Sequence, residues 1–238
     1  MEKIIDYENL RSFAYSNDRL INGEIRGIVL DFYGLGGMNM YGLDPGDALE
    51  YAKKNILYVV PYYNPWSWMN RQAVRLTDEI VGVLCEKYCL SDSVRIVSSG
   101  GSMGGLASIV YCAYARITPV ACVSNCPVCD LVYHFDERPD LPRTIYSALG
   151  EYDCSLEEAL RSCSPLHLVD RLPNIPYTVF HCERDTAVLI EKHAIPFVRE
   201  MEREHDITFV TIPLRGHCDL SAEARVEYRR AIMRAFEE

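Results

Sequence analysis

The chain has 238 residues, of which 49% are hydrophobic and 24% charged, and its formal net charge is -10. This composition is that of an ordinary globular protein, which excludes a disordered chain, a collagen-like repeat and a coiled coil. The acidic balance offers no electrostatic footprint for nucleic acid and disfavours anionic membranes, so neither is expected as a partner. No run of about 18 apolar residues that could span a bilayer occurs in the sequence.

The ten cysteines do not predict a disulfide scaffold, because such scaffolds are short, secreted and rich in loops. The first residues contain neither a long apolar segment nor a small-residue cleavage site of the kind that a signal peptide needs. Several cysteines, including Cys85, Cys112 and Cys122, lie among apolar residues, where a free thiol packs as a small hydrophobe. We therefore expect free thiols and a cytoplasmic protein.

Short apolar runs alternate with amphipathic stretches along the chain. The runs predict strands over residues 25–33, 56–60, 94–97, 120–123, 177–181 and 207–212. Apolar residues spaced three or four apart predict helices over residues 69–84, 106–115 and 190–201, the last one kinked or shortened by Pro196. Asp47 is the expected N-cap of a short helix, and Ser221 that of the C-terminal helix.

Strands that alternate with helices predict an α/β fold, with a mostly parallel central sheet and helices on both of its faces. No repeat or linker divides the sequence, so a single domain over residues 1–238 is expected. Residues 127–171 interrupt the alternation with a segment rich in Asp, Arg, Pro and Ser. An excursion from the carboxyl end of a strand lies at the functional edge of such a sheet, so this segment is predicted to be a small cap beside the active site.

The segment Gly100-Gly101-Ser102-Met103-Gly104 is a G-x-S-x-G motif between a predicted strand and a predicted helix. A nucleophile raised above a sheet needs a sharp turn, and flanking glycines leave room for strained backbone and close helix packing. Ser102 is therefore the candidate nucleophile. The N–H of Met103, at the start of the helix, is placed to face a developing oxyanion.

A serine hydroxyl needs a base to take its proton, and His217 is the best candidate because it follows the last predicted strand. The other five histidines are interpreted as structural or solvated. The acid that orients the base should follow the preceding strand, where Asp185 stands, with Glu183 as the competing carboxylate. The chain order Ser102, Asp185, His217 is the one that α/β-hydrolases use.

With these residues, the sequence resembles the α/β-hydrolase fold, and more narrowly the small esterases related to the prolyl-oligopeptidase catalytic domain. The resemblance extends from Arg26 to His217 and includes the segment from Tyr33 to Gly37. It implies a second oxyanion donor in this segment, the N–H of Leu35. Relatives often carry His-Gly where this chain has Tyr33-Gly34. In the family a tyrosine hydroxyl can donate to the oxyanion, so the Tyr33 hydroxyl is either a donor or part of the packing beneath the loop.

Two further patterns allow more than one interpretation. Cys126 and Cys129 form a C-x-x-C pair, but no second pair at suitable spacing accompanies it, so two packed thiols are expected rather than zinc or a redox couple. Trp66 and Trp68 belong to an aromatic cluster after the strand at residues 56–60, on the sheet edge that carries Ser102. The cluster belongs either to the core or to the lining of a substrate pocket.

These residues predict a serine hydrolase that cleaves a small-molecule carboxylic ester through an acyl-enzyme, without a metal or organic cofactor. A peptidase of the prolyl-oligopeptidase kind is one alternative, although the chain has no room for the substrate-gating domain of such peptidases. The other alternative is a catalytically inactive binding protein on a hydrolase scaffold. The sequence does not indicate the acyl length, the alcohol or the oligomeric state.

Overall fold

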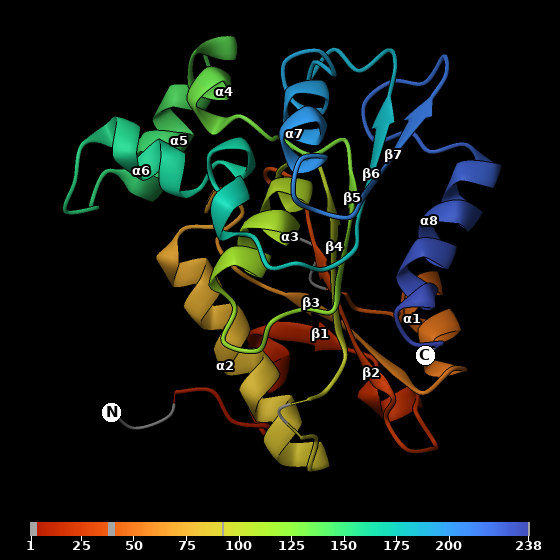
Figure 1. Cartoon of the computed structure of the whole chain (residues 1–238). Coiled ribbons are helices and arrows are strands. Elements are labelled where there is room, and N and C mark those ends of the chain that lie inside the picture. Colours follow the sequence, from red (N-terminus) through yellow and green to blue (C-terminus); the bar gives the residue numbers. More distant parts are fainter. Residues whose placement is uncertain (1–3, 38–40, 92, 238) are drawn as a thin grey trace.

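The computed structural model describes residues 4–37, 41–91 and 93–237. Its centre is one seven-stranded sheet, with the strand order β1-β3-β2-β4-β5-β6-β7 (Figure 1). The strands are β1 (Ala14–Ser16), β2 (Gly27–Phe32), β3 (Ile56–Pro61), β4 (Ile96–Gly101), β5 (Ala121–Asn125), β6 (Tyr177–Cys182) and β7 (Ile207–Ile212). Only β1 pairs antiparallel in this sheet, and the other neighbouring pairs are parallel, which confirms the predicted α/β fold.

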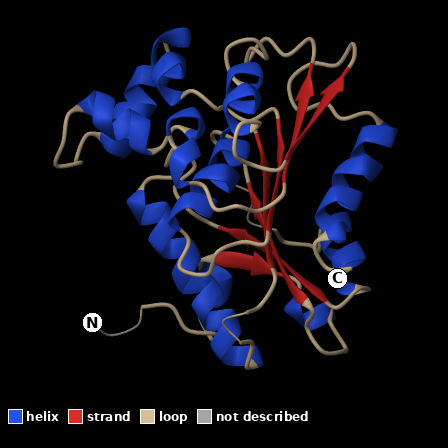
Figure 2. Ribbon diagram, viewed as in Figure 1, coloured by secondary structure: helices blue, strands red, loops and turns tan. Residues whose placement is uncertain are grey.

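Helices cover both faces of the sheet (Figure 2). On one face lie α2 (Arg71–Tyr88), α3 (Met103–Tyr114) and α7 (Ala194–Met201), and on the other lie α1 (Gly46–Ala52) and α8 (Ala222–Arg234). Successive strand side chains point to opposite faces. In β4, Ile96 accordingly packs in the core beneath α2 and α3, and Val97 packs in the core beneath α1 and α8. Burial on both sides explains why the strands are almost continuously apolar.

Helix α2 shows how local sequence sets an element's limits. Asn70 caps it, because the Asn70 side chain accepts a hydrogen bond from the N–H of Ala73 at 3.0 Å. Ala73, Ile80 and Leu84 then face the core, as the spacing of three or four residues predicts. The helix ends where Cys89 adopts a left-handed conformation, with φ of 51°.

Two local features differ from the sequence prediction, and a third, the late start of α7, agrees with one of the two predicted effects of Pro196. Strand β1 was not predicted, because three residues are too few to show a two-residue period. Asp47 is not the N-cap of α1: extended Pro45 occupies that position, and Asp47 lies in the first turn. There its charge suits the positive end of the helix dipole. Helix α7 starts late, at Ala194, which places Pro196 in the first turn, where proline is tolerated.

Residues 127–171 follow β5 and form a group of short helices, which we call the helical insertion. Its elements are α4 (Leu131–Glu137), α5 (Leu141–Leu149), α6 (Leu156–Ser162) and the 3-10 turns η3 (Pro165–His167) and η4 (Val169–Arg171). Leu141, Ile145 and Leu149 of α5 are buried in the same core cluster as α2. The insertion therefore sits on the body of the protein at the end of the sheet where the parallel strands finish (Figure 1). None of the described helices is long and apolar enough to cross a membrane.

Candidate active site

Ser102 occupies a sharp turn between β4 and α3. Its backbone has φ of 60° and ψ of -124°, a combination that non-glycine residues rarely adopt and that persists only where the surroundings enforce it. The N–H of Ser102 donates to the carbonyl of Asn125, at the end of β5, at 2.9 Å. This strained turn projects the side chain above the carboxyl ends of the strands, as a nucleophile elbow requires.

The glycines around Ser102 allow the chain to pass extremely close to β2. A Cβ added to Gly104 would lie 1.9 Å from the carbonyl oxygen of Phe32, and one added to Gly100 would lie 2.4 Å from that of Gly104. Both distances are far inside van der Waals contact with backbone, which cannot move without disturbing the sheet. Residues with side chains are therefore excluded at both positions, and the motif is a steric requirement of the turn.

The imidazole of His217 lies between Ser102 and Asp185. His217 Nε2 is 2.8 Å from Ser102 Oγ, and His217 Nδ1 is 2.7 Å from Asp185 Oδ2. The loop after β7 supplies His217 and the turn after β6 supplies Asp185, so the carboxyl ends of β4, β6 and β7 bring the residues together at one edge of the sheet, with β5 between β4 and β6. In the tautomer that fits, Nδ1–H donates to Asp185 and Nε2 accepts from the Ser102 hydroxyl. The structure thus brings the three residues into one hydrogen-bonded row.

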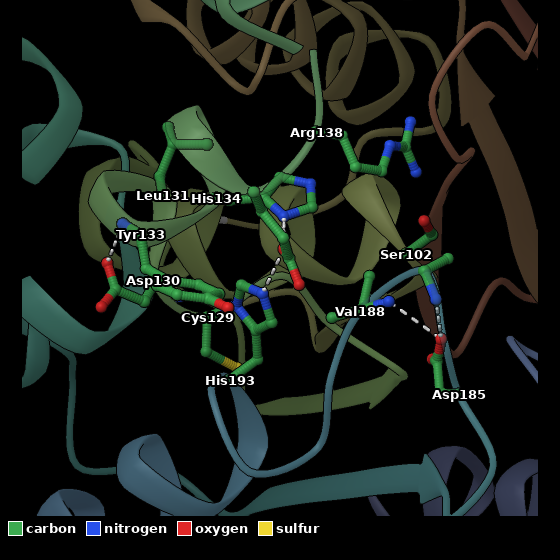
Figure 3. Close-up of polar contacts among 12 residues, drawn as sticks. Ser102, Cys129, Asp130, Leu131, Tyr133, His134, Arg138, Asp185, Val188 and His193 are labelled. Carbon is green, nitrogen blue, oxygen red and sulfur yellow. Dashed lines mark hydrogen bonds and ion pairs between the residues drawn. The ribbon is translucent and has the colours of Figure 1, made fainter. Parts of the chain in front are cut away.

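Asp185 is held as an anion in a fixed orientation. Its Oδ1 accepts hydrogen bonds from the N–H groups of Ala187 and Val188, both at 2.9 Å (Figure 3). Burial raises the pKa of Asp185, but the bonds from His217 and the backbone outweigh burial and lower it overall. Burial likewise lowers the pKa of His217, and the hydrogen bond and charge of Asp185 raise it above its usual value. Glu183, the competing carboxylate, is exposed.

Two backbone N–H groups are available near Ser102. Met103 is the first residue of α3, where no preceding helical turn supplies a carbonyl to its N–H. Leu35 lies in the loop after β2, and within the described residues its N–H donates to no backbone carbonyl. Both residues line the pocket that contains Ser102. Their neighbour Gly34 approaches the serine closely, since a Cβ at position 34 would lie 3.5 Å from that of Ser102.

The Tyr33 hydroxyl is engaged elsewhere, which favours packing beneath the loop over the role of an oxyanion donor. It donates to the carbonyl of Tyr63, and the Tyr63 hydroxyl donates back to the carbonyl of Tyr33 at 3.0 Å. The two rings stack with centroids 4.4 Å apart. A phenol has one hydrogen, and this one already binds a carbonyl, so Tyr33 fastens the loop instead of facing Ser102.

We expect Tyr33→Phe to lower stability while leaving kcat almost unchanged. The substitution removes one hydrogen bond, which costs about 1 kcal/mol of unfolding free energy. Loss of an oxyanion donor would instead lower kcat by about 10²-fold. Urea denaturation and steady-state kinetics on the same preparation separate these results, and a kcat deficit of that size in the folded variant would restore the donor role.

The pocket around Ser102 has a volume of about 600 Å³ and combines apolar and polar walls. Trp68, one of the two tryptophans predicted to bind substrate, is almost fully buried yet lines this pocket, and its Nε1–H donates to Thr144 Oγ1 at 3.2 Å. Trp66 does not line it. Its ring is 44% exposed and borders a separate hollow with Asn64 and Arg143. Backbone turns at residues 64–70 point the two side chains in different directions, which corrects the prediction for Trp66.

His134 and Arg138 also line the pocket, and sequence analysis did not identify either one as a site residue. Both belong to the helical insertion, His134 on α4 and Arg138 at its C-cap. His134 had been interpreted as structural because nothing near it in the sequence marks a site. The apolar pattern around residue 131 is too short to predict α4. The sequence therefore does not predict that these two side chains lie near Ser102.

The described cysteines near the site, Cys126, Cys129, Cys182 and Cys218, are free thiols. Cys126 Sγ accepts from the N–H groups of Cys182 and Cys218, each at 3.4 Å, and Cys129 Sγ donates to the carbonyl of Pro127 at 3.5 Å. Among the described residues, three groups have ligand atoms close enough together for a metal ion. These groups are Cys126–His217–Cys218, Cys126–His181–Asp185 and His134–Glu137–His193. Their histidines and carboxylates already hydrogen-bond to one another or to backbone, which accounts for the clustering without an ion.

The central sheet, the turn at Ser102 and this row of side chains define the class of fold: it is the α/β-hydrolase fold. Residues 76–238, more than half of the chain, match the model of the prolyl oligopeptidase family. The chain therefore belongs to that family. A search of curated protein sequences finds no match.

Solved structures with the same fold include peptidases and esterases. An acylaminoacyl peptidase in complex with a chloromethyl ketone matches 91% of this chain with a TM-score of 0.70 and 16% identity. This chain covers only 37% of that peptidase. An S-formylglutathione hydrolase from Agrobacterium tumefaciens matches 90% of the chain at 15% identity, with a TM-score of 0.68 and 84% of its own length covered. A truncated carbohydrate esterase from gut microbiota matches 91% at 13% identity, with a TM-score of 0.67 and 88% of its length covered.

Proposed function

We propose that this protein is a cytoplasmic serine esterase that cleaves small-molecule carboxylic esters through an acyl-enzyme. The observation that carries the proposal is the hydrogen-bonded row in which Asp185 orients His217 and His217 accepts from Ser102, beside an open pocket of about 600 Å³. Free thiols, several of them buried, suit a reducing cytoplasm.

The geometry supports a two-step reaction. Ser102 Oγ attacks the ester carbonyl while His217 Nε2 takes the hydroxyl proton, and Asp185 stabilises the resulting imidazolium. The N–H groups of Met103 and Leu35 then donate to the oxyanion of the tetrahedral intermediate. His217 returns the proton to the departing alcohol. Water, activated by the same imidazole, finally hydrolyses the acyl-serine and regenerates the enzyme.

An ester rather than a peptide is proposed because two of the matched solved structures, the S-formylglutathione hydrolase and the carbohydrate esterase, act on a thioester and on esters by their names. Peptide hydrolysis is the second candidate, favoured by the family match and by the matched acylaminoacyl peptidase. The two reactions share the acylation chemistry and differ in the group that leaves.

A panel of p-nitrophenyl esters of increasing acyl length, with a p-nitroanilide peptide as the amide control, tests the proposal. We expect turnover of at least the short esters and much slower turnover of the amide. Faster cleavage of the peptide would assign the protein to the peptidases. Failure of a fluorophosphonate probe to label Ser102, with no turnover of any ester, would favour a catalytically inactive binding protein.

A further inference from the structure

The helical insertion places one cationic side chain in the pocket of Ser102. Among the described residues that line this pocket, Arg138 is the only lysine or arginine. Figure 3 shows Arg138 and His134 beside each other on the insertion, with Ser102 nearby. The chain has a net charge of -10, so its overall field repels an anionic substrate. A cation in the pocket attracts such a substrate at short range, where the distant charges are screened.

His134 is fixed by a buried hydrogen-bond network. Its Nδ1 binds Glu137 Oε2, and the same oxygen is 3.1 Å from His193 Nε2. Burial raises the pKa of Glu137, but hydrogen bonds from the two histidines outweigh burial and lower it to about 2, so the carboxylate stays ionised. His193 Nδ1 in turn accepts from the N–H groups of Cys129 and Asp130, at 3.3 and 3.2 Å. This network holds the end of α4, and with it the start of the Arg138 side chain.

Arg138 keeps part of its guanidinium free. Its Nε and Nη2 donate to the two carboxylate oxygens of Asp140 at 3.0 and 2.7 Å. Asp140 thus occupies one edge, and the Nη1 end remains able to bind a second carboxylate, since a guanidinium has five N–H donors. The pair is exposed, with side-chain exposures of 37% and 55%, so solvent screens the attraction between them and Asp140 only partly offsets the charge of Arg138.

Asp31 is the other formally charged side chain of the pocket, and it lies on β2 rather than on the insertion. Burial raises its pKa to about 6, although the Tyr58 hydroxyl donates to its carboxylate. The ionised form of Asp31 disfavours an anion at the sheet side of the pocket. A substrate anion is accommodated only on the side where the insertion supplies Arg138.

We propose that Arg138 selects substrates that carry a carboxylate, which its free guanidinium edge binds while Ser102 attacks the ester. This inference rests on the proposed esterase function and names the class of ester. The carboxylate can belong to the acyl part or to the alcohol part of the ester, because a carboxylate in either part can form the same contact with the Arg138 guanidinium.

Two matched pairs of esters test the proposal and separate these positions. Monoethyl glutarate differs from ethyl pentanoate only by a carboxylate in place of the terminal methyl group of the acyl chain. 4-Acetoxybenzoate differs from p-tolyl acetate in the same way on the leaving group. Rates measured at pH 7.5 by pH-stat, for the purified full chain, give a ratio of kcat/KM within each pair. We expect the anionic member to be favoured about 10-fold in one pair, the scale of one charged hydrogen bond.

Three variants assign the ratio to Arg138. Arg138→Gln is expected to bring the ratio of kcat/KM within the pair close to 1. Arg138→Lys should leave an intermediate ratio, because a lysine keeps the positive charge but lacks the paired N–H donors of a guanidinium. Arg203→Gln removes the same charge from an exposed position at the end of α7, where Arg203 pairs with Glu200, and should keep the wild-type ratio. Thermal denaturation confirms that each variant is folded.

The outcomes are distinct. Turnover of the neutral esters with no anionic preference in either pair, or an Arg138→Gln ratio equal to that of the wild type, overturns the role of Arg138 and leaves the esterase function standing. No turnover of any of the four esters contradicts the esterase function itself, and this inference with it.

Discussion

Ser102→Ala is expected to lower kcat for the best ester by about 10⁶-fold while the protein stays folded. The change removes one hydroxyl from a turn whose shape is set by neighbouring glycines and by the bond from the Ser102 N–H to Asn125, both of which remain. Without Oγ there is nothing for His217 to deprotonate, so the acyl-enzyme cannot form. His217→Ala should cost a similar factor, because members of such a row act as a unit and their losses do not add.

Stopped assays at high enzyme concentration measure the residual rate, and thermal denaturation monitors the fold. Ser91→Ala is a matched control, since Ser91 is exposed and precedes β4, whereas Ser102 follows the opposite end of that strand. A Ser102→Ala variant that kept near wild-type kcat would show that another residue is the nucleophile.

Asp185→Asn is expected to lower kcat by about 10⁴-fold, whereas Glu183→Gln should be nearly neutral. The asparagine fills the same space, but its amide can stabilise the wrong tautomer of His217 and provides no charge for the imidazolium. Asp185 contacts His217 at 2.7 Å, and Glu183 is exposed two residues away, so the paired variants change the same chemical group in different places. The reverse order of effects would transfer the orienting role to Glu183.

The pH profile gives a second readout of the same pair. His217 must be neutral to accept the proton, and Asp185 raises the pKa of His217 above its usual value. The kcat/KM of the wild type should therefore fall as the pH drops through that raised pKa, and Glu183→Gln should follow the same curve. In Asp185→Asn the residual activity should persist to lower pH, because burial then acts on His217 without a compensating anion.

Much of the fold is encoded locally, and for that reason the sequence predicts it. Six of the strands follow from apolar runs, which are buried on both faces except in the partly exposed edge strand β7. Helix α2 follows from a repeat that needs no knowledge of its partners. The antiparallel strand β1 and helix α4 are too short to show a period in the sequence, so apolar spacing does not predict them. The sequence predicts Asp47 as the N-cap of α1, but Pro45 suits a helix start equally well. In the structure the extended backbone at Pro45 makes that residue the N-cap.

At the site, the sequence by itself identified Ser102 and His217 as the candidate pair, because a strained turn between glycines and a histidine after the last strand are local patterns with a chemical reason. It left Asp185 and Glu183 as alternatives. Only the tertiary structure separated them, by burying one carboxylate against His217 and exposing the other. It likewise turned the Tyr33 hydroxyl to Tyr63, directed Trp66 away from the pocket, and brought Arg138 to it. Side-chain direction in loops and short helices depends on contacts between distant segments, and no pattern of neighbouring residues records those contacts.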